Sequence, residues 1–207
     1  MLAFNRLHFS AGLLGTWIVG MGRYWDDTRA ELLQYLGLGS VIYIFVLSAF
    51  IWILLWPFRI AKWNYFTVLT FISLTSFPAI FYAIPVEQYY SHQVASQINV
   101  WFLAIVALWR LALLFFFLKR FCRLSSWTVI VVTLLPICLI ITSLWALNLH
   151  KVVFMVMGGF REPNSYDASY MILSVLTLVS AVLTLPLLIS YFTAIFFNRR
   201  KSISSSE

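Results

Sequence analysis

Charged side chains are scarce in this chain of 207 residues, since Asp, Glu, Lys and Arg make up 10% of it and hydrophobic residues 62%. Soluble domains carry about a quarter charged residues, so too few are present to cover a water-soluble core. Two cysteines exclude a disulfide framework. The sequence also lacks a P-loop, a glycine-rich dinucleotide loop, zinc-spaced Cys and His, an HExxH helix and a GxSxG elbow. We therefore favour a protein without catalytic activity, cofactor or metal site, and keep an enzyme as an open alternative.

Long apolar runs dominate what is present. A membrane-spanning helix needs about 20 apolar residues, and five runs reach that length: 36–56, 65–84, 98–118, 127–147 and 171–197. Aromatic residues mark many of their ends, as in the interfacial belts of membrane proteins. We predict an all-α, polytopic helical membrane bundle that forms a single transmembrane domain over 1–207.

A shorter run, 7–22, leaves the number of spans open. As a helix it would reach only about 24 Å, and its four glycines weaken the case for a span. It is either a sixth span, a half-inserted segment or an interfacial helix. We favour six spans, because five would export the N-terminus. The last run exceeds the hydrocarbon thickness, so we expect it to tilt, kink or project into the cytoplasm before a tail at 198–207.

Basic and acidic residues alternate between successive connections. Six of the seven acids lie in the connections without basic clusters. This is the positive-inside pattern, and with either five or six spans it places the C-terminus in the cytoplasm. We expect contact with anionic lipids on that side. The clusters form no continuous stripe, which argues against nucleic acid. They are Arg59 with Lys62, Lys119 with Arg120 and Arg123, and Arg199 with Arg200 and Lys201.

Arg110 lies inside an apolar run, where a charge is costly and indicates a function. The five strong runs contain no acid, so three interpretations remain. Arg110 extends to the cytoplasmic headgroups, or it bonds the carbonyls of Val132 and Val182, which Pro136 and Pro186 release. In the third interpretation it binds an anionic ligand, a lipid phosphate or the acid of a partner.

Hydroxyl side chains follow one face of the last run, at Ser174, Thr177, Ser180 and Thr184. They either line a polar pathway through proline-broken helices or serve helix packing. We favour packing.

The outer connections supply further candidates for ligand or partner contact, namely Asp26, Asp27, Arg161 and Glu162. Cys122, beside a basic cluster, is either an acylation site or, as we favour, an unmodified thiol at the membrane edge.

Three functions are compatible with this sequence. We favour a non-enzymatic multi-pass protein that assembles with or organises other membrane components, with a membrane protein as partner. The second is a small transporter, channel or lipid-handling protein that uses Arg110 and the proline-broken helices. The third is a lipid-modifying enzyme with an acidic outer-face site built from Asp26, Asp27, Glu87 or His92. We expect the bacterial inner membrane, with a secretory-pathway membrane as the alternative.

Overall fold

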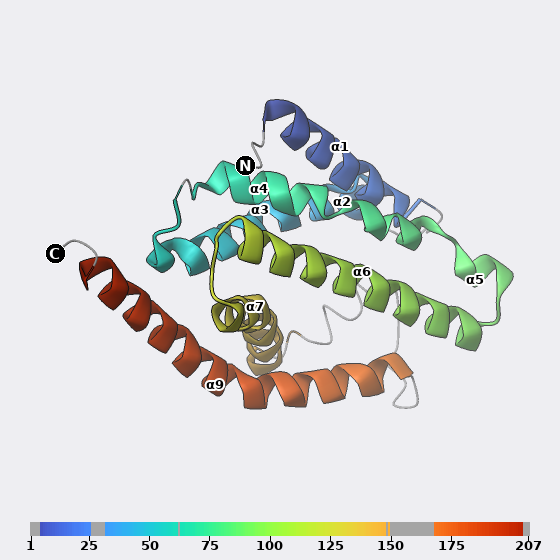
Figure 1. Ribbon diagram of the computed structural model, residues 1–207. Coiled ribbons are helices and arrows are strands. Elements are labelled where there is room, and N and C mark those ends of the chain that lie inside the picture. Colours follow the sequence, from blue (N-terminus) through green and yellow to red (C-terminus); the bar gives the residue numbers. More distant parts are fainter. Residues whose placement is uncertain (1–4, 26–31, 62, 148, 150–167, 205–207) are drawn as a thin grey trace. The chain divides into compact units, whose positions relative to one another are not determined.

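The computed structural model describes residues 5–25, 32–61, 63–147, 149 and 168–204 (Figure 1). The chain separates into two compact units, Met1–Arg123 and Leu124–Glu207. The described residues form helices and no strand, which confirms the all-α class. The single transmembrane domain over 1–207 stays a prediction.

Most of the helices belong to the first unit. They are α1 (Arg6–Gly22), α2 (Leu32–Tyr35), α3 (Leu38–Leu55), η1 (Trp56–Phe58), α4 (Tyr65–Leu74), η2 (Phe77–Ala83), α5 (Val86–Tyr89) and α6 (His92–Arg120). The second unit contains α7 (Ser126–Ala146) and α9 (Ala168–Ser204), which pack against each other.

Four described helices are long and apolar enough to cross a membrane, which suggests an integral membrane protein. These candidate spans correspond to four of the predicted runs, and they are Leu38–Phe58, Gln97–Arg120, Ser126–Ala146 and Ser174–Phe197. The predicted run 65–84 is instead a bent pair of helices, α4 and η2, which differ in direction by 41° and would make a fifth span.

The break between α4 and η2 has a local cause. Pro78 has no N–H to donate to Leu74, and its ring opposes a continued α-helix. The Thr75 hydroxyl donates to the Ile72 carbonyl at 2.7 Å, so a side chain takes over part of the bonding at the end of α4. The buried hydroxyls at this break therefore complete the backbone.

The N-terminal helix α1 begins at a capping box in which Asn5 accepts from the His8 backbone N–H at 3.0 Å. It packs along α4 and η2 in the same direction, because Gly12 lies against Ser73 and Gly22 against Ala83. At 17 residues α1 is shorter than the candidate spans.

Three glycines of α1 are buried and lie on its packing face, and whether this helix spans the membrane stays a prediction. Gly12, Thr16 and Gly20 recur every fourth residue and are all buried. The Thr16 hydroxyl donates to the Gly12 carbonyl at 2.8 Å and reaches the Ser73 carbonyl at 3.2 Å. This small-residue spacing lets two helix backbones approach closely. A Cβ at Gly12 would overlap the Ser73 side chain.

Three residues near helix ends have left-handed backbone. Gly37 precedes α3 with φ 65°, and a Cβ there would lie 2.6 Å from the Met21 backbone nitrogen, so glycine is required. Arg59 (φ 49°) ends η1 and Arg123 (φ 53°) follows α6. A left-handed conformation is unfavourable for a residue with a Cβ.

In the second unit, the predicted hydroxyl face of α9 lies against α7. Ser180 is buried, and Thr184 shares a hydrogen bond with Thr142 of α7 at 3.0 Å. Figure 1 shows α9 changing direction near its middle, and Pro186 lies inside this helix. The helix continues to Ser204, so the tail expected at 198–207 is helical over most of its length.

Candidate functional site

Arg110 lies on the face of α6 that packs into the first unit. Val106, one turn before it, is 2% exposed, and Phe117, seven residues after it, is 5% exposed. Residues three, four and seven apart share one side of a helix. Arg110 itself is half-buried, because it follows this packing face.

The guanidinium of Arg110 lies over an aromatic ring. Its carbon is 6.0 Å from the ring centroid of Tyr43, which belongs to α3. A cation at this distance from a ring face is attracted by the ring quadrupole. The Nε atom of Arg110 is buried and has no hydrogen-bond partner among the described residues. The cation is therefore only partly compensated within the described part of the chain.

A second tyrosine brings a second cation to the same place. Tyr82, in η2, packs against a buried cluster of Val19, Ala79 and Val106. Arg110 and Arg23 are both close enough to Tyr82 to interact with it electrostatically.

Arg23 reaches Tyr82 because it follows the last turn of α1, which runs beside η2. Its guanidinium carbon is 5.2 Å from the Tyr82 ring centroid and 5.5 Å from that of Tyr24. We refer to Arg23, Tyr43, Tyr82 and Arg110 as the Arg110 cluster.

The Arg110 cluster lies away from the basic end of its helix. Side chains on a helix lean toward its N-terminus, and the contact of Tyr82 with Val106, one turn before Arg110, agrees with that direction. Lys119 and Arg120 end α6 on the opposite side. The cluster therefore lies toward the N-terminal side of Arg110, and the choice between the headgroups and an anionic ligand or partner stays a prediction.

In the remaining interpretation, Arg110 hydrogen-bonds carbonyls that the prolines release, and these carbonyls belong to the other unit. The carbonyls of Val132 and Val182 belong to Leu124–Glu207, and Arg110 belongs to Met1–Arg123. A bond between them stays a prediction.

The predicted outer-face candidates Asp26, Asp27, Arg161 and Glu162 lie outside the described residues. For the enzyme alternative, Glu87 lies in α5 and His92 begins α6. Among the side chains that the structure describes, no three of His, Cys, Asp or Glu gather around a possible metal position. The described side chains near Arg110 are cationic and aromatic, and the enzyme alternative stays a prediction.

Cys122 is buried directly after α6, and burial raises the pKa of its thiol to about 12. Thiol reactivity depends on the thiolate, so at neutral pH Cys122 is a poor nucleophile. This favours the unmodified thiol over acylation. Only 8% of Cys122 is exposed, and its position at the membrane edge stays a prediction.

Sequence reasoning identified Arg110 but missed the aromatic residues around it. Tyr43, Tyr82 and Arg23 come from three separate segments, so no spacing in the sequence connects them to Arg110. In contrast, the spacing of Gly12, Thr16 and Gly20 was a signal for the close contact that places Arg23.

No family model, curated protein or solved structure matches this chain. Its function must therefore be argued from the Arg110 cluster and from the surfaces of its helices.

Proposed function

We propose that this chain is a non-enzymatic, multi-pass membrane protein that assembles laterally with another membrane protein. The proposal depends on one residue, Trp109. It occupies the centre of the candidate span Gln97–Arg120 and is 51% exposed. Within the described part of the chain, nothing accepts a hydrogen bond from its indole N–H.

An exposed indole at that depth has a physical cost. Hydrocarbon offers no acceptor for an N–H group, and tryptophan therefore prefers the membrane–water interface. Three other tryptophans have acceptors, since Trp17, Trp25 and Trp63 donate to the carbonyls of Leu36, Ala83 and Trp52 at 2.8, 2.8 and 3.2 Å. Trp109 differs because it has neither an acceptor among the described residues nor an interface nearby.

The surroundings of Trp109 fit a helix–helix contact. Only 11% of the span in α6 is buried, compared with 39% of the span in α7. The exposed stripe in the central part of α6, which we name the Trp109 face, consists of Ile105, Leu108, Trp109 and Phe116. Large aromatic side chains dominate the energetics of protein interfaces. A partner helix with a hydroxyl or free carbonyl would satisfy the indole and cover this face.

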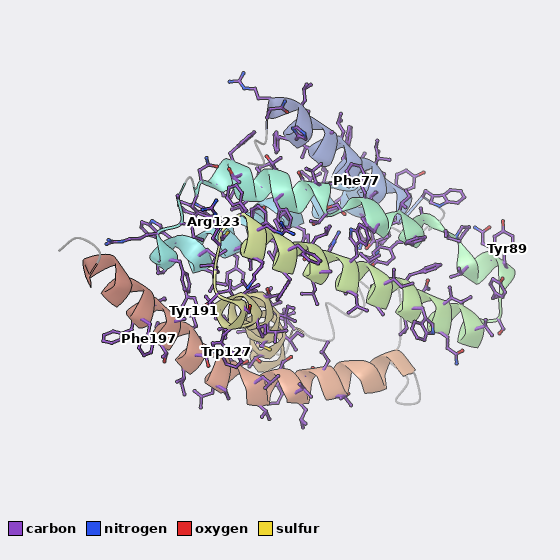
Figure 2. All side chains as sticks on the ribbon, viewed as in Figure 1. Phe77, Tyr89, Arg123, Trp127, Tyr191 and Phe197 are labelled. Atoms are coloured by element: carbon purple, nitrogen blue, oxygen red, sulfur yellow. The ribbon has the colours of Figure 1, made fainter. Side chains whose placement is uncertain are left out.

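Uncovered apolar side chains are not confined to α6. The span in α9 is also 11% buried, and Figure 2 shows Phe197 projecting from that helix. These side chains carry no hydrogen-bonding group, so lipid covers them at no cost. Trp109 is therefore the better indicator of a protein partner.

The test replaces Trp109 with phenylalanine, which keeps the ring and removes the N–H. Trp101→Phe on the same helix is the matched control, because Trp101 is also exposed and lies near the end of the span. The mass of the protein in native-lipid nanodiscs measures assembly. We expect a complex of defined stoichiometry that Trp109→Phe weakens about tenfold or more and Trp101→Phe leaves intact. A strictly monomeric wild-type chain would refute the proposal.

The topology that accompanies this proposal has six spans, with both termini in the cytoplasm of a bacterial inner membrane. It is supported by the parallel packing of α1 along α4 and η2, which gives α1 the direction and depth of the bent pair. A fluorescent protein that matures only in the cytoplasm, fused to either end, tests it. Fluorescence from both fusions supports six spans, and fluorescence from the C-terminal fusion alone supports five.

The second candidate is a small transporter, channel or lipid-handling protein, which the 41° break between α4 and η2 favours. Broken helices line substrate sites in many transporters. We rank it lower because the hydroxyls near the break bond the backbone, as Thr75 and Ser73 do. Solute flux in proteoliposomes that Thr75→Val abolishes would reverse this ranking.

The third candidate is a lipid-modifying enzyme with an acidic outer-face site, whose Asp26 and Asp27 lie outside the described part of the chain. A lipid product whose formation depends on Asp26 would support it, with Asp26→Asn as the variant.

A further inference from the structure

We propose that the Arg110 cluster binds a phosphate group, carried by an anionic phospholipid or by a free phosphate ion. This inference is independent of the assembly proposal, since the Trp109 face and the Arg110 cluster use different residues.

Charge is the first reason. The candidate span Gln97–Arg120 contains no acid, and neither do the other three candidate spans. Arg110 is ten residues, about 15 Å, from the basic end of its helix, whereas Tyr43 is five residues, about 8 Å, from the start of α3 and Arg23 directly follows α1. A charge withdrawn from water is stable only when it is paired or hydrogen-bonded. An anion beside Arg110 would supply the compensation that the described residues give only in part.

Geometry is the second reason. The two guanidinium groups approach Tyr82 from different helices, Arg110 from α6 and Arg23 from the end of α1. Two arginines that meet beside one phenol are placed to share the oxygens of a single phosphate. Arginine forks match the oxygens of phosphate and can bond it through two donors at once.

Hydrogen bonding is the third reason. The Nε atom of Arg110 is buried and has no hydrogen-bond partner in the part of the chain that is described. Nε and one terminal nitrogen form one edge of the guanidinium fork. A phosphate oxygen would accept from Nε, and the Tyr82 hydroxyl could donate to another oxygen.

Access favours a lipid as the carrier of the phosphate. Tyr43, under the Arg110 guanidinium, is 48% exposed, and the neighbouring α3 residues Ile42 and Val46 are 60% and 63% exposed. The site is thus open at the side of α3. Acyl chains attached to the phosphate would lie on these apolar side chains.

The test uses the full-length chain in nanodiscs that contain phosphatidylcholine with a minor fraction of phosphatidylglycerol. Native mass spectrometry counts the phosphatidylglycerol molecules that remain bound after release. We expect one retained molecule on the wild type, and at least a tenfold loss of retention in Arg110→Gln and in Arg23→Gln. Arg110→Lys should be intermediate, because it keeps the charge and loses the fork. Arg6→Gln is the matched control and should retain the lipid, because Arg6 is an exposed arginine at the opposite end of α1 from Arg23.

A second arm distinguishes the two sources of phosphate. Calorimetric titration of the detergent-purified chain with inorganic phosphate, compared with chloride, reports binding of the free ion. If inorganic phosphate binds the wild type but not Arg110→Gln, and the nanodisc experiment shows no retained phosphatidylglycerol, the site binds a small anion. The proposal fails if neither phosphate source binds or if Arg6→Gln loses binding as fully as Arg110→Gln. It also fails if a partner protein's carboxylate crosslinks to position 110 instead. Helix content by circular dichroism confirms that each variant is folded.

Discussion

Replacing Gly12 with alanine tests the contact on which the first unit is built. The added Cβ would meet the Ser73 side chain, and it would lie 3.1 Å from the Leu74 backbone nitrogen. Ser73 is fully buried, and its hydroxyl donates to the Thr70 carbonyl at 2.9 Å. The side chain therefore has no free space to turn into.

Two costs determine the size of the effect. Inserting a methyl group into a packed contact costs about 1–3 kcal/mol. If Ser73 turns away, it also loses a hydrogen bond worth about 1 kcal/mol. We expect Gly12→Ala to lower the free energy of unfolding by about 2–4 kcal/mol. Rigid movement of α1 would not avoid this, because it would break the Thr16 bond to Ser73.

Gly39→Ala is the matched control. Gly39 lies in the first turn of α3, and a Cβ there meets nothing within 4 Å. Alanine favours a helix over glycine by up to about 1 kcal/mol, so this variant should be neutral or more stable. Unfolding by sodium dodecyl sulfate in mixed micelles, followed by circular dichroism, gives both values. If Gly12→Ala is as stable as Gly39→Ala, α1 does not pack on α4 as described.

Three further predictions address other features. Alkylation of Cys122, followed on its own peptide by mass spectrometry, should be slow at pH 8, where about one thiol in ten thousand is ionised. The alkylation rate of Cys122 should keep rising tenfold per pH unit up to about pH 12. The rate for the control variant Ser126→Cys, at an exposed position, should level off near pH 9. A plateau near pH 9 for Cys122 would contradict its burial. Arg59→Gly should be more stable than Arg59→Ala by about 1 kcal/mol, because both variants lose the charge and only glycine adopts a positive φ without strain. Equal stabilities in the same detergent titration would contradict a left-handed conformation at Arg59. Thr184→Val should lower the free energy of unfolding by about 0.6 kcal/mol, the usual value of a hydrogen bond between membrane helices. A double-mutant cycle with Thr142→Val should show that this loss comes from the bond between the two hydroxyls. Additive losses in the two single variants would show that the bond is not formed.

The helical runs could be predicted from hydropathy because a spanning helix places its signal in about 20 consecutive residues. The predicted run 98–118 lies within α6, and 127–147 matches α7 to within one residue at each end. The bend in 65–84 was harder to predict. Pro78 marked it, but a proline either kinks a helix or ends it, and the outcome depends on the neighbouring helices.

The N-terminal helix shows where composition misleads. Counting four glycines as evidence against a span ignored their spacing, and the spacing of Gly12, Thr16 and Gly20 places them on one buried face of α1. Glycine is costly only if nothing packs against it, and here Ser73 lies against Gly12 and Phe77 against Gly15.

The Arg110 cluster could be predicted only in part. The cost of a charge in an apolar run identified Arg110 without any structure, because that cost depends on one residue and its immediate neighbours in sequence. The direction of its side chain depends on which face of α6 packs, and α6 carries aromatic residues on several faces. Tyr43 and Tyr82 become its neighbours only through the contacts between helices.

The positions of Trp109 and Arg110 make the two proposals separable. Consecutive helix residues point about 100° apart, so the indole faces outward while the guanidinium faces Tyr43. Each side chain has a donor that lacks an acceptor among the described residues. In our two proposals a partner helix supplies the acceptor for Trp109 and a phosphate supplies the acceptor for Arg110. Trp109→Phe should then weaken assembly and leave the retained phospholipid in place, whereas Arg110→Gln should do the reverse. If either variant disturbs both properties, a single partner that carries both an acceptor and an anionic group occupies this part of α6.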